Sequence, residues 1–529
     1  MKYLFTLWLG LLLWPSPGSL MAQTTVTKQV LIVNGGQFDP NPGFPANPAN
    51  IQIYNPEDGT YRALDTIGVT SVQDILVEGS VAFLAAQDSI VRYDLAGESR
   101  EAIVAFGGES TICMAVTDSL LLVGNFYLPF GSTDPYPNNL RVFDRKSLAL
   151  LDSVPALALP VKSIVVEGEY AYLTQNYTSS SFSDSAGFLV KLNLNTLVVE
   201  DTLQVNQNAE DLGPLVKVGT QIFGLNGTSN SITTFDLNTQ LATTDTANAD
   251  IDPGSYGSRF DFDGNGDFYT VANGDIAQYD LLSRSVVQAG VVDTVISGFA
   301  LDTLAGRFYI TQTDYFSYTG GIIYDQQGGR LDTLYTGYSP EVIELVYNQV
   351  PEVASVDTMV VMGDSVQVLL SIVDRDPGAR VSVELIEMPN FGEAYLRGDT
   401  LVYTSSHTTG GGSGTFSDSV RYRVMDEWGD ADTAWLRIEI DGSSSIITYE
   451  KLQASISPNP GTGLLKISLA EPWSGVVQII DIQGRVLKEL SMHSGKDIEW
   501  RDLADIPAGT YMIRGIGNGK SWQSRWLKL

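Results

Sequence analysis

The sequence predicts an all-β protein: a seven-bladed β-propeller followed by an Ig-like β-sandwich and a small C-terminal β-sandwich. Two observations predict the propeller: a strand-turn-strand motif that recurs at blade-length intervals, and a lone N-terminal strand without a partner nearby. A third, the alternation of apolar and polar residues after residue 350, predicts the two sandwiches. With 529 residues, the chain is long enough for several domains.

Residues 1–22 have the pattern of a secretory signal peptide. Lys2 precedes an apolar run from Tyr3 to Trp14, and a small residue, Ala22, stands at the expected cleavage site. That run is too short to span a bilayer, and no later stretch is long and apolar enough to do so. We therefore expect an exported protein without a membrane span.

The propeller, residues 23–349, is predicted from a repeat. A strand that ends in an aromatic residue or Leu, then Asp or Asn and a turn into another strand, recurs at separations of 39, 50, 49, 43, 44 and 45 residues. This is the length of a four-stranded blade. Asp or Asn opens each turn because its side chain can accept hydrogen bonds from the backbone amides ahead. The turn-opening residues are Asn55, Asp94, Asp144, Asn193, Asp236, Asp280 and Asp325.

One blade is split between the two ends of this region. EVIELVYN, residues 341–348, is its innermost strand, QVLIVNG near the N-terminus is the second, and NIQIYN and YRALDTI are the others. We expect the N-terminal strand to close the ring and so remove exposed sheet edges. A row of separate sandwiches is the structural alternative.

One face of the propeller is predicted to bind a ligand or partner. It carries the loops between second and third strands, several of which are long and rich in Pro, Gly and aromatic residues. Exposed aromatic side chains bury much area at little entropic cost on binding; the alternative is that they fold down to seal the ring. The candidate ligand-binding residues are Phe38, Phe44, Phe126, Tyr127, Phe130, Tyr136, Tyr177, Phe182, Tyr315, Phe316 and Tyr318.

Composition excludes several functions. The 62 acidic residues outnumber the 31 basic ones, which argues against a nucleic-acid partner because phosphate binding needs a concentrated positive surface. The single cysteine, Cys113, excludes an intramolecular disulfide framework and a lipid-anchored cysteine next to the leader. His407 and His493, the two histidines, follow the propeller, which excludes a His-based catalytic or metal site inside it. Trp428 is the first tryptophan after the leader, so a WD-type signature is missing.

The segment DFDGNGDFYTVA begins like a calcium loop. Its candidate metal ligands are Asp261, Asp263, Asn265 and Asp267. Its twelfth position is Ala272, where an EF-hand needs a bidentate Glu. We therefore favour an Asn-Gly hairpin turn between the first two strands of a blade. Calcium is the one cofactor that the sequence suggests.

Residues 350–442 form the second unit. DRDPGARVSVEL, GEAYLRGDTLVYT and DSVRYRVMDEWGDADTAWLRIEI are alternating strands at sandwich spacing. These stretches resemble the Ig-like and cadherin-like repeats of bacterial surface proteins. Some members of that family bind calcium through acidic loops, which here points to Asp374 and Asp376. For one isolated unit we expect a rigid spacer.

Residues 443–453 are a linker, and residues 454–529 form the third unit. The last 80 residues hold 10 Lys and Arg against 8 Asp and Glu, whereas the rest of the chain holds 21 against 54. The strands and turns of this unit closely resemble the C-terminal sorting domain of type IX secretion cargo. That resemblance implies contact with the secretion machinery and passage through the periplasm to the outer surface or the medium. The matching positions are Pro458, Asn459, Pro460, Asp481, Gly484, Gly509, Tyr511 and Lys528.

The N-terminal part carries a further resemblance. VLIVNGGQFDPNPG and the strands that follow it, as far as SIVRYDL, resemble YVTN-like surface propellers of Bacteroidetes, some of which are cobalamin-capturing lipoproteins. We expect non-catalytic capture of a small nutrient, a glycan or a protein. The alternatives are a secreted lyase or hydrolase that works with Asp, Glu, Tyr and Arg, and an adhesin for other cells.

Overall fold

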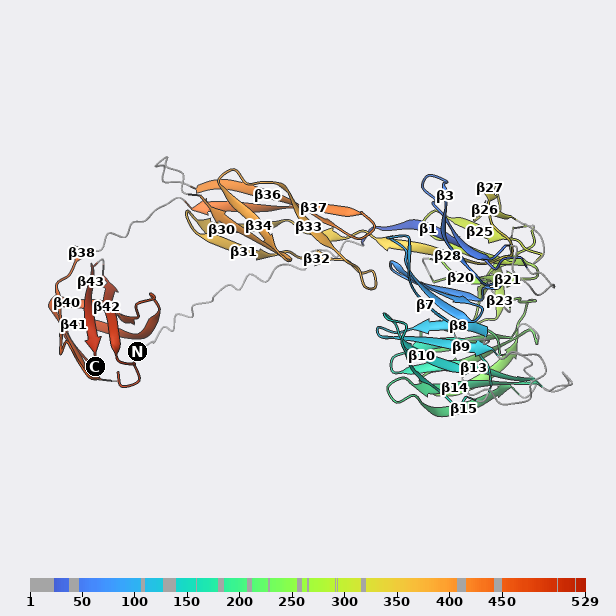
Figure 1. Cartoon of the computed structure of the whole chain (residues 1–529), viewed down its shortest axis with the longest axis horizontal. Helices are drawn as coiled ribbons and strands as arrows, with labels where there is room; N and C mark the ends of the chain where they lie inside the picture. Colours follow the sequence, from blue (N-terminus) through green and yellow to red (C-terminus); the bar gives the residue numbers. More distant parts are fainter. Residues whose placement is uncertain are drawn as a thin grey trace, which may run out of the picture.

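The structure is a computed structural model, in which the described part of the chain is built from strands (Figure 1). None of the described residues belongs to a helix long and apolar enough to cross a membrane. The all-β prediction is therefore confirmed. The structure describes residues 23–37, 47–105, 110–126, 139–157, 159–178, 185–206, 212–226, 229–254, 259–263, 266–290, 292, 294–314, 320–406, 415–441, 450–501, 503–518 and 520–529.

Seven four-stranded antiparallel sheets follow one another in the propeller region, which we define as residues 23–349. Six of these sheets use four consecutive strands each. Their strands are β4 (Asp74–Glu78), β5 (Val81–Ala86), β6 (Ser89–Asp94), β7 (Ser99–Ala105), β8 (Ser110–Val116), β9 (Leu120–Phe126), β10 (Leu140–Asp144), β11 (Leu150–Ser153), β12 (Val161–Glu167), β13 (Tyr170–Thr178), β14 (Ser185–Asn193), β15 (Val198–Asn206), β16 (Leu215–Val218), β17 (Gln221–Asn226), β18 (Ser231–Asp236), β19 (Leu241–Thr246), β20 (Phe260–Phe262), β21 (Phe268–Ala272), β22 (Asp275–Asp280), β23 (Ser285–Gln288), β24 (Gly298–Asp302), β25 (Arg307–Thr311), β26 (Gly321–Asp325) and β27 (Arg330–Leu334).

The remaining sheet joins the two ends of this region. It has the order β28-β1-β2-β3, with β1 at Thr25–Asn34, β2 at Ala49–Tyr54, β3 at Tyr61–Ile67 and β28 at Pro340–Gln349. β1 pairs antiparallel with β28 along its whole length. The innermost strands contact each other in the order β20, β24, β28, β4, β8, β12 and β16, so β28 lies between the first and the last of the six other sheets. The N-terminal strand thus lies in the sheet that the sequence assigns to the split blade. That this sheet closes one propeller stays a prediction.

β1 is apolar on both faces because it lies between two neighbouring sheets. Leu31 and Val33 belong to a core cluster that includes residues of β4 and β5. Val30 and Ile32 belong to another cluster, with residues of β24, β25 and β26. All four side chains are completely buried. Each buried side chain contributes about 1.5–3 kcal/mol to the stability of the fold relative to an exposed one. Because both faces of β1 are buried, QVLIVN is a continuous apolar run and not an alternating one.

The second unit, which we call the sandwich, consists of two facing sheets and a short strand pair. The sheets have the orders β30-β37-β36-β33 and β31-β35-β34, and their inner faces share one core that includes Leu401, Tyr403 and Leu436. The strands are β29 (Glu352–Val353), β30 (Val356–Val361), β31 (Ser365–Leu369), β32 (Ile372–Val373), β33 (Ser382–Glu387), β34 (Gly392–Arg397), β35 (Thr400–Ser405), β36 (Thr415–Met425) and β37 (Ala431–Asp441).

The C-terminal unit is a six-stranded assembly in the order β38-β43-β42-β40-β39, with β41 paired to β40. Its core contains four tryptophans, and the ring centroids of two of them, Trp473 and Trp522, lie 6.3 Å apart. The strands are β38 (Glu450–Lys451), β39 (Ala454–Ser457), β40 (Leu465–Ile480), β41 (Val486–Trp500), β42 (Gly509–Gly517) and β43 (Lys520–Lys528).

Candidate functional site

The face predicted to bind a ligand lies where β1 ends and β28 begins. We call it the connection face, because the connections that lead from one sheet to the next pass there. The backbone of Phe126 ends β9, and Tyr177 lies near the end of β13, so both strands run toward this face. The other nine candidate residues lie outside the described part of the chain, and their role stays a prediction. These are Phe38, Phe44, Tyr127, Phe130, Tyr136, Phe182, Tyr315, Phe316 and Tyr318.

Buried asparagines hold the backbone at the connection face. Asn34 Oδ1 accepts a hydrogen bond from Gly337 N at 2.8 Å, in the connection that leads into β28. Asn176 accepts from Leu212 N at 2.9 Å and donates to Leu212 O at 3.0 Å, in the connection that leads into β16. These side chains supply partners to backbone groups that no strand satisfies. The connections are therefore tied to the second strands of the sheets.

Hydrogen bonds between innermost strands recur around the ring. In three places the amide of one innermost strand donates to a side-chain oxygen of the preceding one. The bonds are Met114 N to Asp74 Oδ2 (2.9 Å), Leu215 N to Ser163 Oγ (2.9 Å) and Leu301 N to Asp261 Oδ2 (2.8 Å). Asp74 and Asp261 thus each tie an innermost strand to the next one, and Glu344 is a third acid on an innermost strand, β28.

Asp74, Asp261 and Glu344 lie on innermost strands, and each of these residues retains some accessible surface. Burial raises the pKa of Asp74 to about 7 and that of Asp261 to about 6. Both carboxyl groups accept hydrogen bonds from backbone amides, and these bonds lower the pKa but do not cancel the effect of burial. Burial, and then the negative charges of Asp261 and Asp74, raise the pKa of Glu344 to about 8. Near neutral pH, Glu344 is mainly protonated and Asp261 is mainly ionised.

A cavity of about 130 Å³ adjoins two of these acids. Asp261, Asp263, Thr303, Glu344 and Tyr347 contribute to its wall. Two neighbouring carboxyl groups with different pKa values can serve as the acid and the base of a catalytic site. The volume, however, is below the roughly 300–1,000 Å³ of pockets that take small-molecule ligands. The cavity has room for water or a small ion and not for a sugar or a cofactor.

The sequence pattern did not predict that Asp74 and Glu344 belong to one cluster. A signal was present, because an acid interrupts the apolar run in QDILVEG and in VIELVYN. The two acids can be recognised as neighbours only from the tertiary structure, which brings β4 beside β28 although the two strands are far apart in the sequence.

The candidate calcium ligands serve other bonds. Asp263 N donates to Asp267 O at 2.9 Å, and Asp263 Oδ1 accepts from Asp267 N at 2.8 Å, which closes a turn between β20 and β21. Asp261 faces the next sheet, as described above, and Asn265 lies outside the described residues. Across the described ranges, no group of three or more His, Cys, Asp or Glu is arranged to hold a metal ion. The turn accounts for these bonds, and a calcium site stays a prediction.

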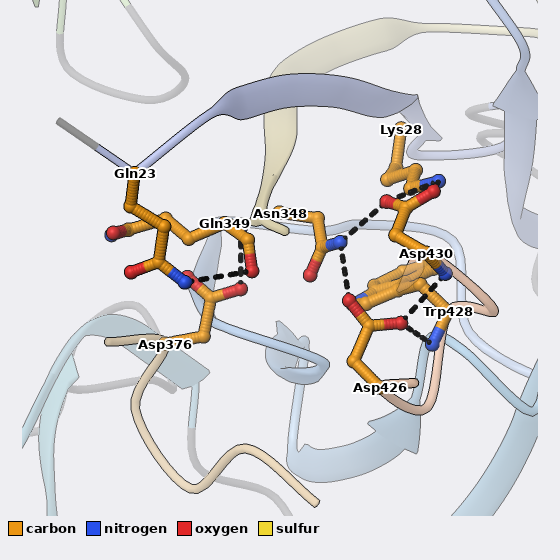
Figure 2. Close-up of polar contacts among 8 residues, drawn as sticks. All are labelled: Gln23, Lys28, Asn348, Gln349, Asp376, Asp426, Trp428 and Asp430. Carbon is orange, nitrogen blue, oxygen red and sulfur yellow. Dashed lines mark hydrogen bonds and ion pairs between the residues drawn. The ribbon is translucent and has the colours of Figure 1, made fainter. Parts of the chain in front are cut away.

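The sandwich contacts the propeller region where β1 and β28 close the ring (Figure 2). Lys28 Nζ lies 2.7 Å from Asp430 Oδ2. Asn348 Nδ2, at the end of β28, donates to Asp426 Oδ2 at 2.8 Å and to Asp430 Oδ2 at 2.6 Å. Trp428, which lies between these two acids in the sequence, packs against the core cluster that contains β1. The sandwich thus holds both strands of the closure.

Further bonds extend this contact (Figure 2). Gln349 N donates to Asp376 Oδ2 at 2.8 Å, so this acid, one of the two implied as calcium ligands, serves the domain contact. Burial is the largest cause that raises the pKa values of Asp374 and Asp376. Gln23 Nε2 donates to Val350 O at 2.7 Å. All these contacts lie at the start of β1 and the end of β28, opposite the connection face.

The sorting-domain positions hold turns of the C-terminal unit. Asp481 Oδ1 accepts from Arg485 N at 2.9 Å across the turn between β40 and β41, where Gly484 has a φ of 84°. At such a positive φ, glycine avoids the steric cost of a side chain. Tyr511 Oη, two residues after the start of β42 at Gly509, donates to Pro507 O at 2.8 Å.

Other sorting-domain positions hold the last strand. Asn459 Oδ1, between Pro458 and Pro460, accepts from Leu527 N at 2.9 Å. Lys528 is only 5% exposed, and its ammonium group donates to three main-chain carbonyls in the turn before β42. The carbonyls are those of Leu503, Ala504 and Ile506. A buried cation needs such partners, so these residues lock β43 into the domain.

Comparisons with solved structures give only weak likenesses. A 6-phosphogluconolactonase candidate from Bacteroides fragilis is 12% identical, with 60% of this chain and 98% of that chain covered and a TM-score of 0.43. The periplasmic gluconolactonase of Pseudomonas aeruginosa is 11% identical, with coverages of 61% and 99% and a TM-score of 0.43. Apo AztD from Citrobacter koseri is 14% identical, with coverages of 61% and 98% and a TM-score of 0.36. These values carry no argument about activity.

No curated protein shows detectable sequence similarity to this chain. Residues 455–528, in contrast, match the family model of the secretion system C-terminal sorting domain. This match confirms the prediction from the C-terminal motifs. The protein is type IX secretion cargo, exported to the cell surface or the extracellular space.

Proposed function

We propose that this exported protein is a non-catalytic binding protein, which captures a small nutrient, a glycan or another protein through the connection face. In this proposal the seven four-stranded sheets are the blades of one closed propeller. Residues 350–442 are an Ig-like spacer between the propeller and the sorting domain. Removal of the N-terminal leader and release from the cell or attachment to its surface are compatible with this function.

The observation that carries the proposal is the position of the sandwich. It contacts the propeller region at the start of β1 and the end of β28, through Lys28, Asn348 and Gln349. The connection face lies at the other end of the same strands, beside Asn34. The spacer therefore leaves that face free for a ligand, and the buried asparagines keep its connections in place.

The test is a binding screen on the full chain with cobalamin, glycans and metal ions, followed by calorimetry of each hit. The triple variant Phe126→Ala, Tyr127→Ala and Phe130→Ala should weaken the binding of a true ligand at least tenfold and leave the melting temperature unchanged. Unchanged affinity in the triple variant would contradict the assignment of the face. Saturable attachment to other cells without small-molecule binding would favour the adhesin.

A secreted lyase or hydrolase is the second candidate, because Asp261 and Glu344 have pKa values of about 6 and 8 beside one cavity. The low volume of that cavity, about 130 Å³, and the structural bond of Asp261 to the next sheet favour binding over catalysis. The test is a substrate panel. Turnover of one substrate by the unchanged protein would support the enzyme, provided that the Glu344→Gln variant loses this turnover and keeps the fold.

A further inference from the structure

A second cavity, of about 510 Å³, lies between the propeller region and the sandwich. Its volume is within the range of small-molecule pockets, which often lie at domain interfaces. Three parts of the chain line it: the sheet β4–β7, the sheet β8–β11 and the loop of the sandwich before β33. Its charged lining residues are Arg92, Asp94, Glu101, Asp118, Arg145, Lys146 and Arg380.

The wall of this interface cavity is fixed from both sides. Ser80 Oγ donates to Glu427 Oε1 at 2.7 Å, and Arg380 N donates to Glu427 Oε2 at 2.8 Å. Gly79 has a φ of 54°, and a Cβ atom at this position would lie 2.8 Å from Pro377 O. The close approach of the sandwich loop thus needs a glycine here. The interface cavity is a built feature and not a gap between loosely placed domains.

Four basic and three acidic residues line the interface cavity, whereas acidic residues outnumber basic ones by 62 to 31 in the whole chain. The side chains of Arg92 and Arg145 are only 17% and 16% exposed. Burial is the main cause that lowers the pKa of Arg92, and the positive charges of Arg145 and Arg380 lower it further, against the effect of Asp94. Gathering like charges costs free energy unless an anion compensates for it.

The ion pairs present leave donors free. Arg92 pairs with Glu101, Arg145 pairs with Glu78, and Arg380 Nη2 lies 3.2 Å from Asp94 Oδ2. Each lining arginine thus has one carboxylate partner. A guanidinium group has five N–H donors, and Arg92 Nε is buried without a hydrogen-bond partner in the described part of the chain. Lys146 is exposed at the rim and forms no ion pair with any described residue. The interface cavity can therefore accept one more negatively charged group.

We propose that the interface cavity binds an acidic sugar, a small molecule with one carboxylate and several hydroxyl groups. Guanidinium groups bind a carboxylate with two parallel hydrogen bonds. The carboxylates of Asp94 and Asp118 can accept the hydroxyl hydrogens. Sulfate offers no hydrogen-bond donor to these acids, and a neutral sugar lacks the charge that the basic groups select.

The test is isothermal titration calorimetry of the full chain at low ionic strength, with glucuronate, glucose and sulfate as probes. We expect saturable binding of glucuronate, at least tenfold tighter than that of glucose or sulfate. Lys146→Ala should weaken it several-fold without affecting the fold, because this side chain is exposed, and Lys146→Ala with Arg92→Gln should weaken it more than tenfold. Lys217→Ala is the matched control, since Lys217 pairs with Glu167 in other sheets, and it should bind as the unchanged protein does.

Several outcomes would overturn the proposal. If glucose bound as tightly as glucuronate, the cavity would not recognise the carboxylate. If sulfate bound as tightly as glucuronate, the cavity would be a general anion site. Full affinity in the Lys146→Ala variant, or no binding of glucuronate at all, would also refute it. The triple alanine variant of the connection face should keep its affinity for glucuronate, so failure of one site can be told from failure of the other.

Discussion

Asn348 Nδ2 lies 2.6 Å from Asp430 Oδ2, a bond between the end of β28 and the sandwich. The same nitrogen donates to Asp426, and Asp430 pairs with Lys28 of β1. One amide and one carboxylate thus connect both closing strands to the second domain (Figure 2). These contacts predict that the sandwich stabilises the propeller region.

Replacing Asn348 should weaken this closure. Asn348 is 1% exposed, and Asn348→Ala leaves two neighbouring carboxylates without their shared donor. We expect a loss of about 2 kcal/mol in the free energy of unfolding and a lower calorimetric midpoint for the propeller region. Asp357→Ala, in an exposed ion pair of the sandwich, is the control and should change stability by less than about 0.5 kcal/mol. Equal midpoints for the two variants would contradict the role of Asn348.

Trp428 should govern how firmly the sandwich is held. Its side chain packs against the core cluster of β1, so Trp428→Ala removes the main apolar contact between the two parts. We expect a larger radius of gyration in small-angle scattering. Trp435→Ala is the matched control, because Trp435 stacks on Arg421 within the sandwich. An unchanged scattering curve for Trp428→Ala would mean that the polar bonds suffice.

The innermost carboxyl groups predict a pH dependence. In the unfolded chain a Glu loses its proton near pH 4, whereas Glu344 in the folded chain keeps it up to about pH 8. Unfolding between these values releases a proton, so stability should be highest at low pH and fall as pH rises, by up to about 1 kcal/mol per pH unit. Asp74 acts in the same direction up to about pH 7.

The variant Glu344→Gln separates this effect from others. Glutamine cannot ionise, so the fall in stability from pH 5 to pH 8, measured by thermal denaturation, should become shallower. Glu393→Gln, at an exposed position of β34, should leave the slope unchanged. A slope that is the same in all three proteins would refute the assignment.

Lys528 should determine whether the sorting domain folds firmly. Lys528→Met leaves three buried carbonyls without a donor, which should cost about 2–3 kcal/mol, make β43 sensitive to limited proteolysis and reduce export. Lys466→Met, in an exposed ion pair with Glu499, is the control and should be exported normally. Normal export of the Lys528 variant would show that the buried ammonium group is dispensable.

The sequence by itself determined the elements and their order. The repeat spacing and the turn-opening acids predicted the sheets, the unpaired QVLIVN run predicted the closure, and the C-terminal motifs predicted the sorting domain. These features are local, or repeat at a fixed spacing, because turn chemistry and strand patterning depend on neighbouring residues.

Only the tertiary structure decided which side chains meet. Glu344 interacts electrostatically with both Asp74 and Asp261, which are far from it in the sequence, because β28 lies beside β4 and is separated from β20 by β24 alone. The bond of Asn348 to Asp430 and the basic groups of the interface cavity likewise depend on how two domains pack. Such contacts depend on the relative positions of whole sheets, which no local pattern of residues specifies.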